Sequence, residues 1–358
     1  MPTPAPQPGE IPGSVLLREI REQPASLARL LEHRDEYAAV AKASSPYGSK
    51  LVRLVAHGSS DNAASYGVYA FGLLPGWTAL RDSISLSVYY GADTDLHGSC
   101  VVALSQSGQT PDVVEYVERA RARGAFTIAL TNEAASPLAD AAHEVLPLAA
   151  GSEQGIAATK TYTAQVAALA LLAGYAAGEG ERVVDGLEEV TSLLADLIPV
   201  LERRLAEVAV ALAFVGRMFV IGRGSEFATA REISLKLLET CRIAAAPLTA
   251  TDLAHGPVAA LDGLFPVWTI ASDDPLLPAV REAAARVHAA GATLLVSGTG
   301  AASIPDAAYY VPVPKPTLPL LAPLLSVVPG QLLAWALAQA KGLDPDRPDG
   351  LTKVTLAL

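Results

Sequence analysis

Two stretches of the chain repeat one pattern of strands and helices at a nearly constant separation. Gly58-Ser59 recurs as Gly224-Ser225, 166 residues later. Four further features recur 167 residues later in the same strand–loop–helix surroundings: Ser105 at Ser272, Pro111 at Pro278, Glu115 at Glu282 and Gly124-Ala125 at Gly291-Ala292. A near-constant offset over several features predicts an internal duplication of one structural unit.

The repeated pattern predicts an α/β fold. Apolar runs at residues 51–56 and 218–221 each open a region in which strand and helix patterns alternate, and such alternation is typical of a parallel sheet covered by helices on both faces. We therefore expect two tandem αβα sandwiches. Residues 15–31 indicate a pair of helices interrupted at Pro24, and residues 164–215 indicate nearly continuous helix between the two sheets.

Composition excludes several classes of partner. The net charge of −11 argues against nucleic acid and against an anionic membrane surface. The longest clean apolar run, at 166–177, is shorter than the roughly 20 residues of a spanning helix. No basic-then-apolar leader opens the chain, so we expect a cytoplasmic protein. Cys100 and Cys241 lie in apolar segments and are expected to be buried thiols without a metal-binding pattern.

A polar stretch follows the apolar run 101–104 and precedes a helix that starts at Pro111: Ser105-Gln106-Ser107-Gly108-Gln109-Thr110. At this point a helix N-terminus offers unpaired N–H groups and the positive end of its dipole. Three hydroxyls and a glycine then make a phosphate site, with Ser105, Gln106, Ser107 and Thr110 as its side chains. The other interpretation is an ordinary polar turn with Thr110 as the helix cap.

The second copy differs at this point, since it reads Ser272-Asp273-Asp274-Pro275. Two carboxylates at a helix N-terminus would repel a phosphate. We therefore expect one working phosphate site in the chain.

The second copy carries its own set of charged residues. Helical spacing places Glu232, Lys236 and Glu239 on one face, whereas Ile233, Leu237 and Leu238 are expected to pack elsewhere. The set is either a solvated, salt-bridged face or, in a partly dry cleft, a base that moves protons on carbon. Downstream, His255 lies beside a Gly-Pro turn, and Lys353 lies in an apolar tail that is expected to dock.

Taken together, these motifs resemble the double sugar isomerase (SIS) family over essentially the whole chain after about residue 15. The motifs occur in the family's order: Ser105-Gln106-Ser107-Gly108, Glu232…Lys236…Glu239, His255-Gly256-Pro257 and the Lys353 tail. The segment 155–160 also resembles the family's sugar-contacting loop, although Ala158 stands where a serine is common. The resemblance implies that Ser59, Ser60, Ile156 and Ala158 contact the sugar.

Within the family, the chain resembles stand-alone glucosamine-6-phosphate deaminases and the isomerase part of glucosamine-6-phosphate synthase. His57-Gly58-Ser59-Ser60-Asp61, residues 109–112 and the tail 344–348 are similar to the deaminases, although His57 replaces an expected arginine. With no cysteine before Cys100, we expect no glutaminase domain and no glutamine-dependent amination.

The resemblance implies a mechanism. Ser105, Gln106, Ser107 and Thr110 hold the phosphate, and His255 from a neighbouring subunit of a homodimer helps to open the sugar ring. Glu239 moves a proton between C2 and C1, and the ketose imine is hydrolysed to fructose 6-phosphate and ammonia. Lys236, Glu232 and Lys353 orient the base and polarise the reacting centre. The chemistry requires no metal and no redox cofactor.

Three alternatives stay open: a deglycase acting on a phosphorylated fructosamine, a plain aldose–ketose isomerase, and a non-catalytic sugar-phosphate sensor. The expected organisation is a disordered tail (1–14), SIS domain 1 (15–205), SIS domain 2 (206–345) and a C-terminal tail (346–358) that closes the site.

Overall fold

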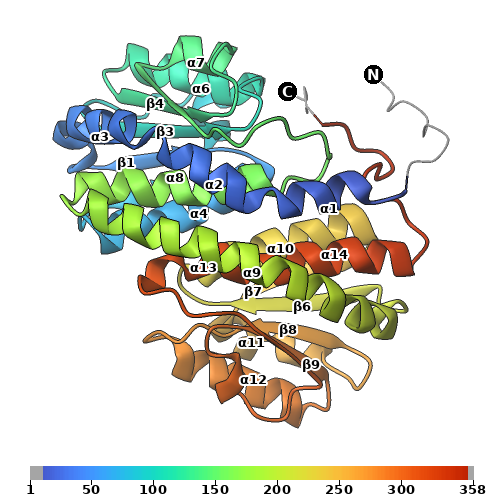
Figure 1. The fold of residues 1–358 in the computed structure, drawn as a ribbon. Helices are drawn as coiled ribbons and strands as arrows, with labels where there is room; N and C mark the ends of the chain where they lie inside the picture. The colour runs from blue at the N-terminus through green and yellow to red at the C-terminus, as the bar shows by residue number, and fades with distance from the viewer. Residues whose placement is uncertain (1–10, 354–358) are drawn as a thin grey trace. The chain divides into compact units, whose positions relative to one another are not determined.

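The computed structural model describes residues 11–353, and within this range the chain forms two sheets of five strands each. All strand pairs in both sheets are parallel. Helices flank each sheet (Figure 1). The α/β class with two tandem parallel sheets, as expected from the sequence, is confirmed.

The described residues divide into two compact units with one sheet in each. The β1–β5 unit comprises Ala25–Glu153, Lys160–Glu188 and Lys353, and the β6–β10 unit comprises residues 11–24, Gln154–Thr159 and Glu189–Thr352. The units are therefore interleaved along the chain, whereas the expected domains are linear, at 15–205 and 206–345. The expected sugar-contacting loop belongs to the unit of the second sheet.

In the β1–β5 unit the strand order is β2-β1-β3-β4-β5. The strands are β1 Val52–Val55, β2 Ala79–Arg81, β3 Cys100–Ser105, β4 Phe126–Thr131 and β5 Glu144–Pro147. The helices that begin in this unit are α3 Arg34–Gly48, α4 Gly58–Leu73, α5 Ile84–Val88, α6 Pro111–Ala122, α7 Pro137–Ala141, α8 Lys160–Ala176 and α9 Gly180–Leu212. Figure 1 shows α6 and α7 on one face of this sheet and α3, α4 and α8 on the other.

Burial on both faces explains the composition of these elements. Every residue of β3 is buried, as an apolar run without alternation predicts for a central parallel strand. On one face, Val113 and Val117 of α6 join Val101 and Ala103 of β3 in a single apolar cluster. On the other face, α8 is buried from Lys160 to Gly174, and its many alanines allow close packing against α4.

The β6–β10 unit repeats this topology, with the strand order β10-β9-β8-β6-β7. Its strands are β6 Arg217–Gly222, β7 Ala244–Thr249, β8 Pro266–Ile270, β9 Thr293–Gly298 and β10 Tyr309–Pro312. Its helices are α1 Ser14–Arg21, α10 Glu226–Cys241, α11 Ala250–Ala254, α12 Leu277–Ala289, α13 Ala322–Ser326 and α14 Val328–Ala340, and α2 Gln23–Leu31 begins here. Three short 3-10 helices complete it: η1 Pro257–Ala260, η2 Ala301–Ser303 and η3 Pro319–Leu321.

The duplicated features occupy equivalent places in the two units. Gly58 precedes the body of α4 with φ +56°, and Gly224 precedes α10 with φ +63°. Pro111 and Pro278 lie in the first turn of α6 and α12, respectively. Reading β7-β6-β8-β9-β10 against β2-β1-β3-β4-β5 matches the strands one to one. The structure thus supports the internal duplication.

The connecting helices agree with the sequence, with small corrections. The N-terminal pair is α1 and α2, separated at Glu22 just before the Gln23-Pro24 start of α2. The expected continuous helix at 164–215 is α8 followed by the long α9. The expected disordered tail lies mainly outside the described residues, but Ser14 at its end is helical. Residues 354–358 of the expected closing tail are also outside the described range.

One stretch, Pro319–Ala340, is long and apolar enough to cross a membrane by length and composition alone. Its most apolar window is 89% buried, where α13 and α14 contact α10. Such burial is typical of a core helix that satisfies the same criteria.

A buried carboxylate ties the 154–159 segment to α1. Glu19 is fully buried and accepts hydrogen bonds from the backbone N–H groups of Gln154 and Gly155, at 3.1 and 3.2 Å for the latter. Arg18 on the same helix donates to the Gln154 side-chain oxygen at 3.0 Å. These contacts position Ile156 and Ala158 relative to α1.

We expect Glu19→Ala to lower the free energy of unfolding by about 2–4 kcal/mol, because the buried Gly155 N–H and the partly buried Gln154 N–H would lose their acceptor. Hydrogen exchange at the amides of Gln154 and Gly155 should accelerate in the variant. The control is Glu22→Ala, which removes a 39% exposed carboxylate paired with Arg18 at 3.6 Å and should cost less than about 1 kcal/mol. Equal effects of the two substitutions on urea denaturation would contradict this role of Glu19.

Candidate functional site

The 105–110 loop connects the end of β3 to the start of α6, as the sequence predicts. Ser105 Oγ accepts the Gly108 N–H at 3.1 Å and lies 3.2 Å from Thr110 Oγ1. Ser107 Oγ accepts the Gln109 N–H at 3.3 Å. The hydroxyls are therefore gathered around the turn by the loop's own backbone.

Gly108 is required by the geometry of this turn. Its φ is +63°, and a Cβ atom at this position would lie 2.1 Å from Ser136 Oγ. Its carbonyl accepts the Leu138 N–H at 3.1 Å, and the neighbouring Gln106 carbonyl accepts the Asn132 N–H at 3.1 Å. The loop is thus fixed against the residues that follow β4, and it needs little rearrangement to bind an anion.

The start of α6 supplies the electrostatics of an anion site. Thr110 is the N-cap residue without a side-chain capping bond, and Pro111 begins the helix. The first-turn N–H groups and the helix dipole favour a negative ligand here. Ser105 is buried, and the other three side chains, those of Gln106, Ser107 and Thr110, are half-buried. The loop therefore offers neutral donors on a surface that is only partly in contact with water.

Ser59 and Ser60 lie in the same unit, at the start of α4. Both are half-buried, and Ser60 Oγ accepts a hydrogen bond from Gln165 Nε2 at 2.9 Å. Because β1 pairs directly with β3, the residues after both strands are neighbours at the carboxyl edge of the sheet. The structure therefore brings these serines next to the 105–110 loop.

Lys353 also belongs to this unit, through a residue that the sequence analysis missed. Its Nζ lies 2.8 Å from Glu153 Oε2, and the Glu153 side chain is completely buried. The same carboxyl group accepts the N–H of Thr161 at 3.1 Å and its hydroxyl at 2.7 Å. Glu153 thus joins the tail to the start of α8.

In the β6–β10 unit, α10 brings the predicted charged residues together. Lys236 Nζ lies 2.6 Å from Glu239 Oε2 and 3.5 Å from Glu232 Oε1. The Glu232 side chain is 0% exposed, that of Lys236 is 2% exposed and that of Glu239 is 20% exposed. Of the two carboxylates, Glu239 is the one that can meet a ligand.

The apolar positions of α10 follow the expectation with one exception. Ile233 and Leu237 are fully buried in the unit. Leu238 is 54% exposed, so the expectation that it packs is wrong. Helical spacing places it beyond the buried stripe, next to the exposed side of Glu239.

His255 follows α11 and is exposed. Thr249 and Asp252 form a capping box that fixes the start of this helix, with Asp252 Oδ2 2.6 Å from the Thr249 hydroxyl. That hydrogen bond lowers the pKa of Asp252, and His255 and Arg223 lower the pKa further. The imidazole of His255 is therefore accessible to solvent.

Ile156 and Ala158, the remaining sugar-contact candidates, lie in the segment held by Glu19 and are half-buried. The candidates therefore fall into two groups. The β1–β5 unit contains Ser59, Ser60, the 105–110 loop and Lys353, and the β6–β10 unit contains Ile156, Ala158, Glu232, Lys236, Glu239 and His255.

In the β6–β10 unit, the serine that corresponds to Ser105 contacts a buried carboxyl group of the protein itself. Ser272, the counterpart of Ser105, donates to Glu226 Oε1 at 2.6 Å, and Ser326 donates to the same oxygen at 2.9 Å. Glu226 is 1% exposed and occupies the position equivalent to Ser60. The sequence analysis expects no phosphate site here because of Asp273 and Asp274, and Glu226 is a further carboxyl group at this place.

Asp273 and Asp274 have other partners. Asp273 Oδ2 lies 2.6 Å from Lys315 Nζ, and Asp274 Oδ1 accepts the Leu276 N–H at 2.8 Å. Burial raises the pKa of Glu226, and its hydroxyl partners oppose this rise. The Glu226 carboxyl group therefore accepts hydroxyl hydrogen bonds at the place that corresponds to the 105–110 loop.

The two cysteines are buried free thiols, as expected, and burial raises the pKa of Cys100 to about 12 and that of Cys241 to about 11. Across residues 11–353, no group of three or more His, Cys, Asp or Glu side chains is placed to hold a metal ion.

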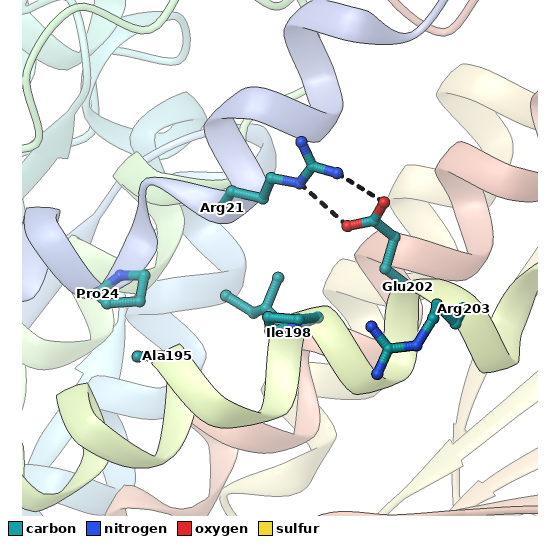
Figure 2. Close-up of a pocket in the computed structure, with 7 residues that line it drawn as sticks. Arg21, Pro24, Ala195, Ile198, Glu202 and Arg203 are labelled. Carbon is teal, nitrogen blue, oxygen red and sulfur yellow. Dashed lines mark hydrogen bonds and ion pairs between the residues drawn. The ribbon is translucent and has the colours of Figure 1, made fainter.

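A cavity of about 430 Å³ in the β6–β10 unit is separate from these candidates. Figure 2 shows Arg21 of α1 paired with Glu202 of α9 across it. Its lining residues are Arg21, Pro24, Ala195, Ile198, Pro199, Glu202 and Arg203, and no predicted site residue is among them.

Comparison with known proteins identifies relatives over nearly the whole chain. The sequence model of the SIS domain family matches residues 47–174. An isomerizing glutamine–fructose-6-phosphate aminotransferase of Thermus thermophilus is 35% identical over 352 residues. That alignment covers 94% of this chain, and the chain spans 58% of the length of the relative.

Solved structures extend the comparison. A presumed phosphosugar isomerase of Silicibacter pomeroyi DSS-3 is 31% identical with a TM-score of 0.83, covering 94% of this chain and all of that one. The C-terminal domain of glucosamine-fructose-6-phosphate aminotransferase from Francisella tularensis has a TM-score of 0.85 at 24% identity, covering 96% of this chain and all of that one. The second likeness concerns the fold.

We expect Glu226→Gln to change how stability depends on pH. A carboxyl group with a raised pKa binds its proton more tightly in the folded state, so its contribution to stability falls as pH rises above the ordinary pKa of glutamate. Between pH 5 and pH 8 the wild type should therefore lose stability relative to Glu226→Gln, by on the order of 1–3 kcal/mol.

Urea denaturation at both pH values measures this difference. Glu282→Gln is the control, because its carboxylate is 67% exposed in a surface pair with Arg286. If the free energy of unfolding depends on pH in the same way in the wild type and in Glu226→Gln, ionisation of this carboxyl group does not destabilise the folded state and the prediction is wrong.

Proposed function

The chain belongs to the SIS-type sugar isomerase family, and we propose that it converts glucosamine 6-phosphate to fructose 6-phosphate and ammonia. The observation that carries the proposal is the Glu232–Lys236–Glu239 set on α10. The buried ammonium group of Lys236 is held there between two carboxylates, and that of Glu239 is partly exposed. Charged groups are expensive to bury, so such a set is well suited to proton transfer and poorly suited to a surface helix.

Glu239 is the proposed base in this reaction. In the open-chain aldose, its carboxylate removes the proton from C2 while the C1 carbonyl oxygen takes up a proton from solvent, which gives an enolamine with a C1–C2 double bond. Return of the proton to C1 gives the ketose imine, and water replaces the nitrogen and releases ammonia. Lys236 keeps the Glu239 carboxylate oriented by a 2.6 Å ion pair. Glu232, without exposure, acts on Lys236 rather than on the substrate.

The 105–110 loop is the proposed phosphate site. Ser105, Gln106, Ser107 and Thr110 provide neutral donors, and the α6 N-terminus provides the dipole. Ser59, Ser60, Ile156 and Ala158 are proposed to contact the sugar. Lys353, held by Glu153, is proposed to polarise the carbonyl or imine. In the homodimer that we propose, His255 acts on the ring oxygen in a neighbouring subunit, and its exposure is consistent with this role.

We expect Glu239→Gln to reduce turnover at least about 100-fold, because a neutral amide cannot accept the C2 proton. The assay couples ammonia release from glucosamine 6-phosphate to the detection of fructose 6-phosphate. Leu238→Ala, an exposed neighbour on the same helix, should retain activity. Wild-type turnover by Glu239→Gln would move the base to another residue.

The same assay distinguishes the alternatives. Aldose–ketose conversion without ammonia would indicate a plain isomerase, and activity confined to fructosamine 6-phosphates would indicate a deglycase. A phosphate-dependent rise in Tm without turnover on any of these substrates would indicate a sensor.

Mixing two inactive chains tests the role of His255. If His255 serves the neighbouring subunit, a heterodimer of His255→Ala and Glu239→Gln chains contains one intact site. An equal mixture should then recover about a quarter of wild-type activity, because half of the dimers are mixed. If the mixture is no more active than the separate variants, His255 does not serve the neighbouring subunit.

A further inference from the structure

An imidazole–carboxylate pair lies at the edge of the 105–110 loop. His57 follows β1, and its Nε2 lies 2.8 Å from Asp112 Oδ2 in the first turn of α6. The His57 side chain is 55% exposed, whereas that of Asp112 is 8% exposed. A solvent-facing ring is therefore anchored by a buried carboxylate.

The sheet register places this ring beside the loop. Val55 of β1 pairs with Ala103 of β3. Two residues after each of these positions, His57 is therefore level with Ser105. Asp112 follows the loop by two residues. The pair thus connects the end of β1 to the helix whose N-terminus forms the phosphate site.

The hydrogen bond determines which nitrogen of the ring is available. A carboxylate can only accept, so Nε2 carries the proton and Nδ1 remains for a ligand. Tyr89, which follows α5, also donates to Asp112 Oδ2 at 3.3 Å. Two donors on one oxygen fix the carboxylate, and through it the ring.

The charges of the surrounding elements point to the same role. Arg53 of β1 pairs with Asp82, Arg81 of β2 with Asp61 of α4, and Arg119 with Glu115 on α6. Asp112 is the titratable group that meets the ring, and Tyr89 meets Asp112 from the other side of the carboxylate oxygen. A sugar phosphate is largely a dianion at neutral pH, and the loop itself offers only neutral donors. His57 is paired with Asp112 as well, but its second ring nitrogen, Nδ1, is still available and becomes a donor when the ring is protonated.

We propose that His57 is a specificity-determining residue that contacts the substrate phosphate through Nδ1, with Asp112 as its positioning residue. The proposal rests on the phosphate-binding role of the 105–110 loop in the proposed function. Protonated His57 donates to a phosphate oxygen, and binding of the dianion in turn favours the protonated ring. His57 thereby makes the loop selective for a doubly charged group.

Binding of sulfate and of inorganic phosphate to the full-length chain, measured by calorimetry from pH 5.5 to 8.5, tests the proposal. Sulfate stays doubly charged over this range, so a change in its affinity belongs to the protein. We expect the wild-type affinity for sulfate to fall about tenfold as pH rises. His57→Gln should bind about tenfold more weakly at pH 5.5, with little dependence on pH.

Three further variants separate charge from structure. His57→Lys keeps a positive charge and should restore affinity without the pH dependence. Asp112→Asn should weaken the pH dependence while preserving the fold. His97→Gln, an exposed histidine before β3 at the opposite end of the sheet, should behave as wild type.

With glucosamine 6-phosphate, His57→Gln should raise KM about tenfold and leave kcat within about twofold. Wild-type sulfate affinity and pH profile in His57→Gln would overturn the role of His57 and leave the loop assignment intact. A wild-type chain that binds neither anion would overturn the phosphate site itself, and the role of His57 with it.

Discussion

The buried ammonium group of Lys236 determines how α10 can be used. An ion without water is tolerated only beside opposite charge, and the helix supplies Glu232 one turn before it and Glu239 one turn after it. Removal of either carboxylate would leave Lys236 with only one of these two ion-pair partners. Because the Glu232 side chain is completely enclosed, it contacts Lys236 and has no surface to offer a ligand. Glu239 shares the same ion pair but keeps a partly exposed edge, so substrate chemistry on this helix has one available carboxylate.

The two repeats differ at the residues that form the proposed phosphate site. Both repeats place a serine after the third strand in chain order and start a helix at a similar distance from it, as Ser105 with α6 and Ser272 with α12 show. At the start of the helix that follows the first strand of each repeat, α4 has Ser60 and α10 has Glu226. Glu226 accepts the hydrogen bonds of Ser272 and Ser326 that a bound anion would accept. One repeat thus keeps its donors for a ligand, and the other has satisfied them internally.

Local patterns were sufficient for much of the fold and for part of the candidate site. The β-branched run before Ser105 and the glycine at 108 predicted the strand and the turn, because both depend on neighbouring residues. Helical spacing also predicted that Glu232, Lys236 and Glu239 meet. Contacts between residues distant in sequence were not accessible in this way: Glu153 meets Lys353 across 200 residues, and Glu226 meets Ser326 across 100. The prediction that Leu238 packs was wrong for another reason, because the sequence does not show which edge of an apolar helix stripe faces solvent.

The phosphate loop has to act against the charge of the whole chain. With a net charge of −11, long-range electrostatics oppose the approach of a dianion, and screening by salt limits this effect to about one Debye length. Binding therefore depends on dipoles and charges within a few ångströms of the ligand. A helix N-terminus satisfies this condition because its field is local and its N–H groups are fixed in direction. The proposed role of His57 satisfies it as well, because Asp112 holds the ring and the His57 side chain is 55% exposed. The acidic composition and the neutral loop thus both favour a small, local source of positive charge at the end of β1.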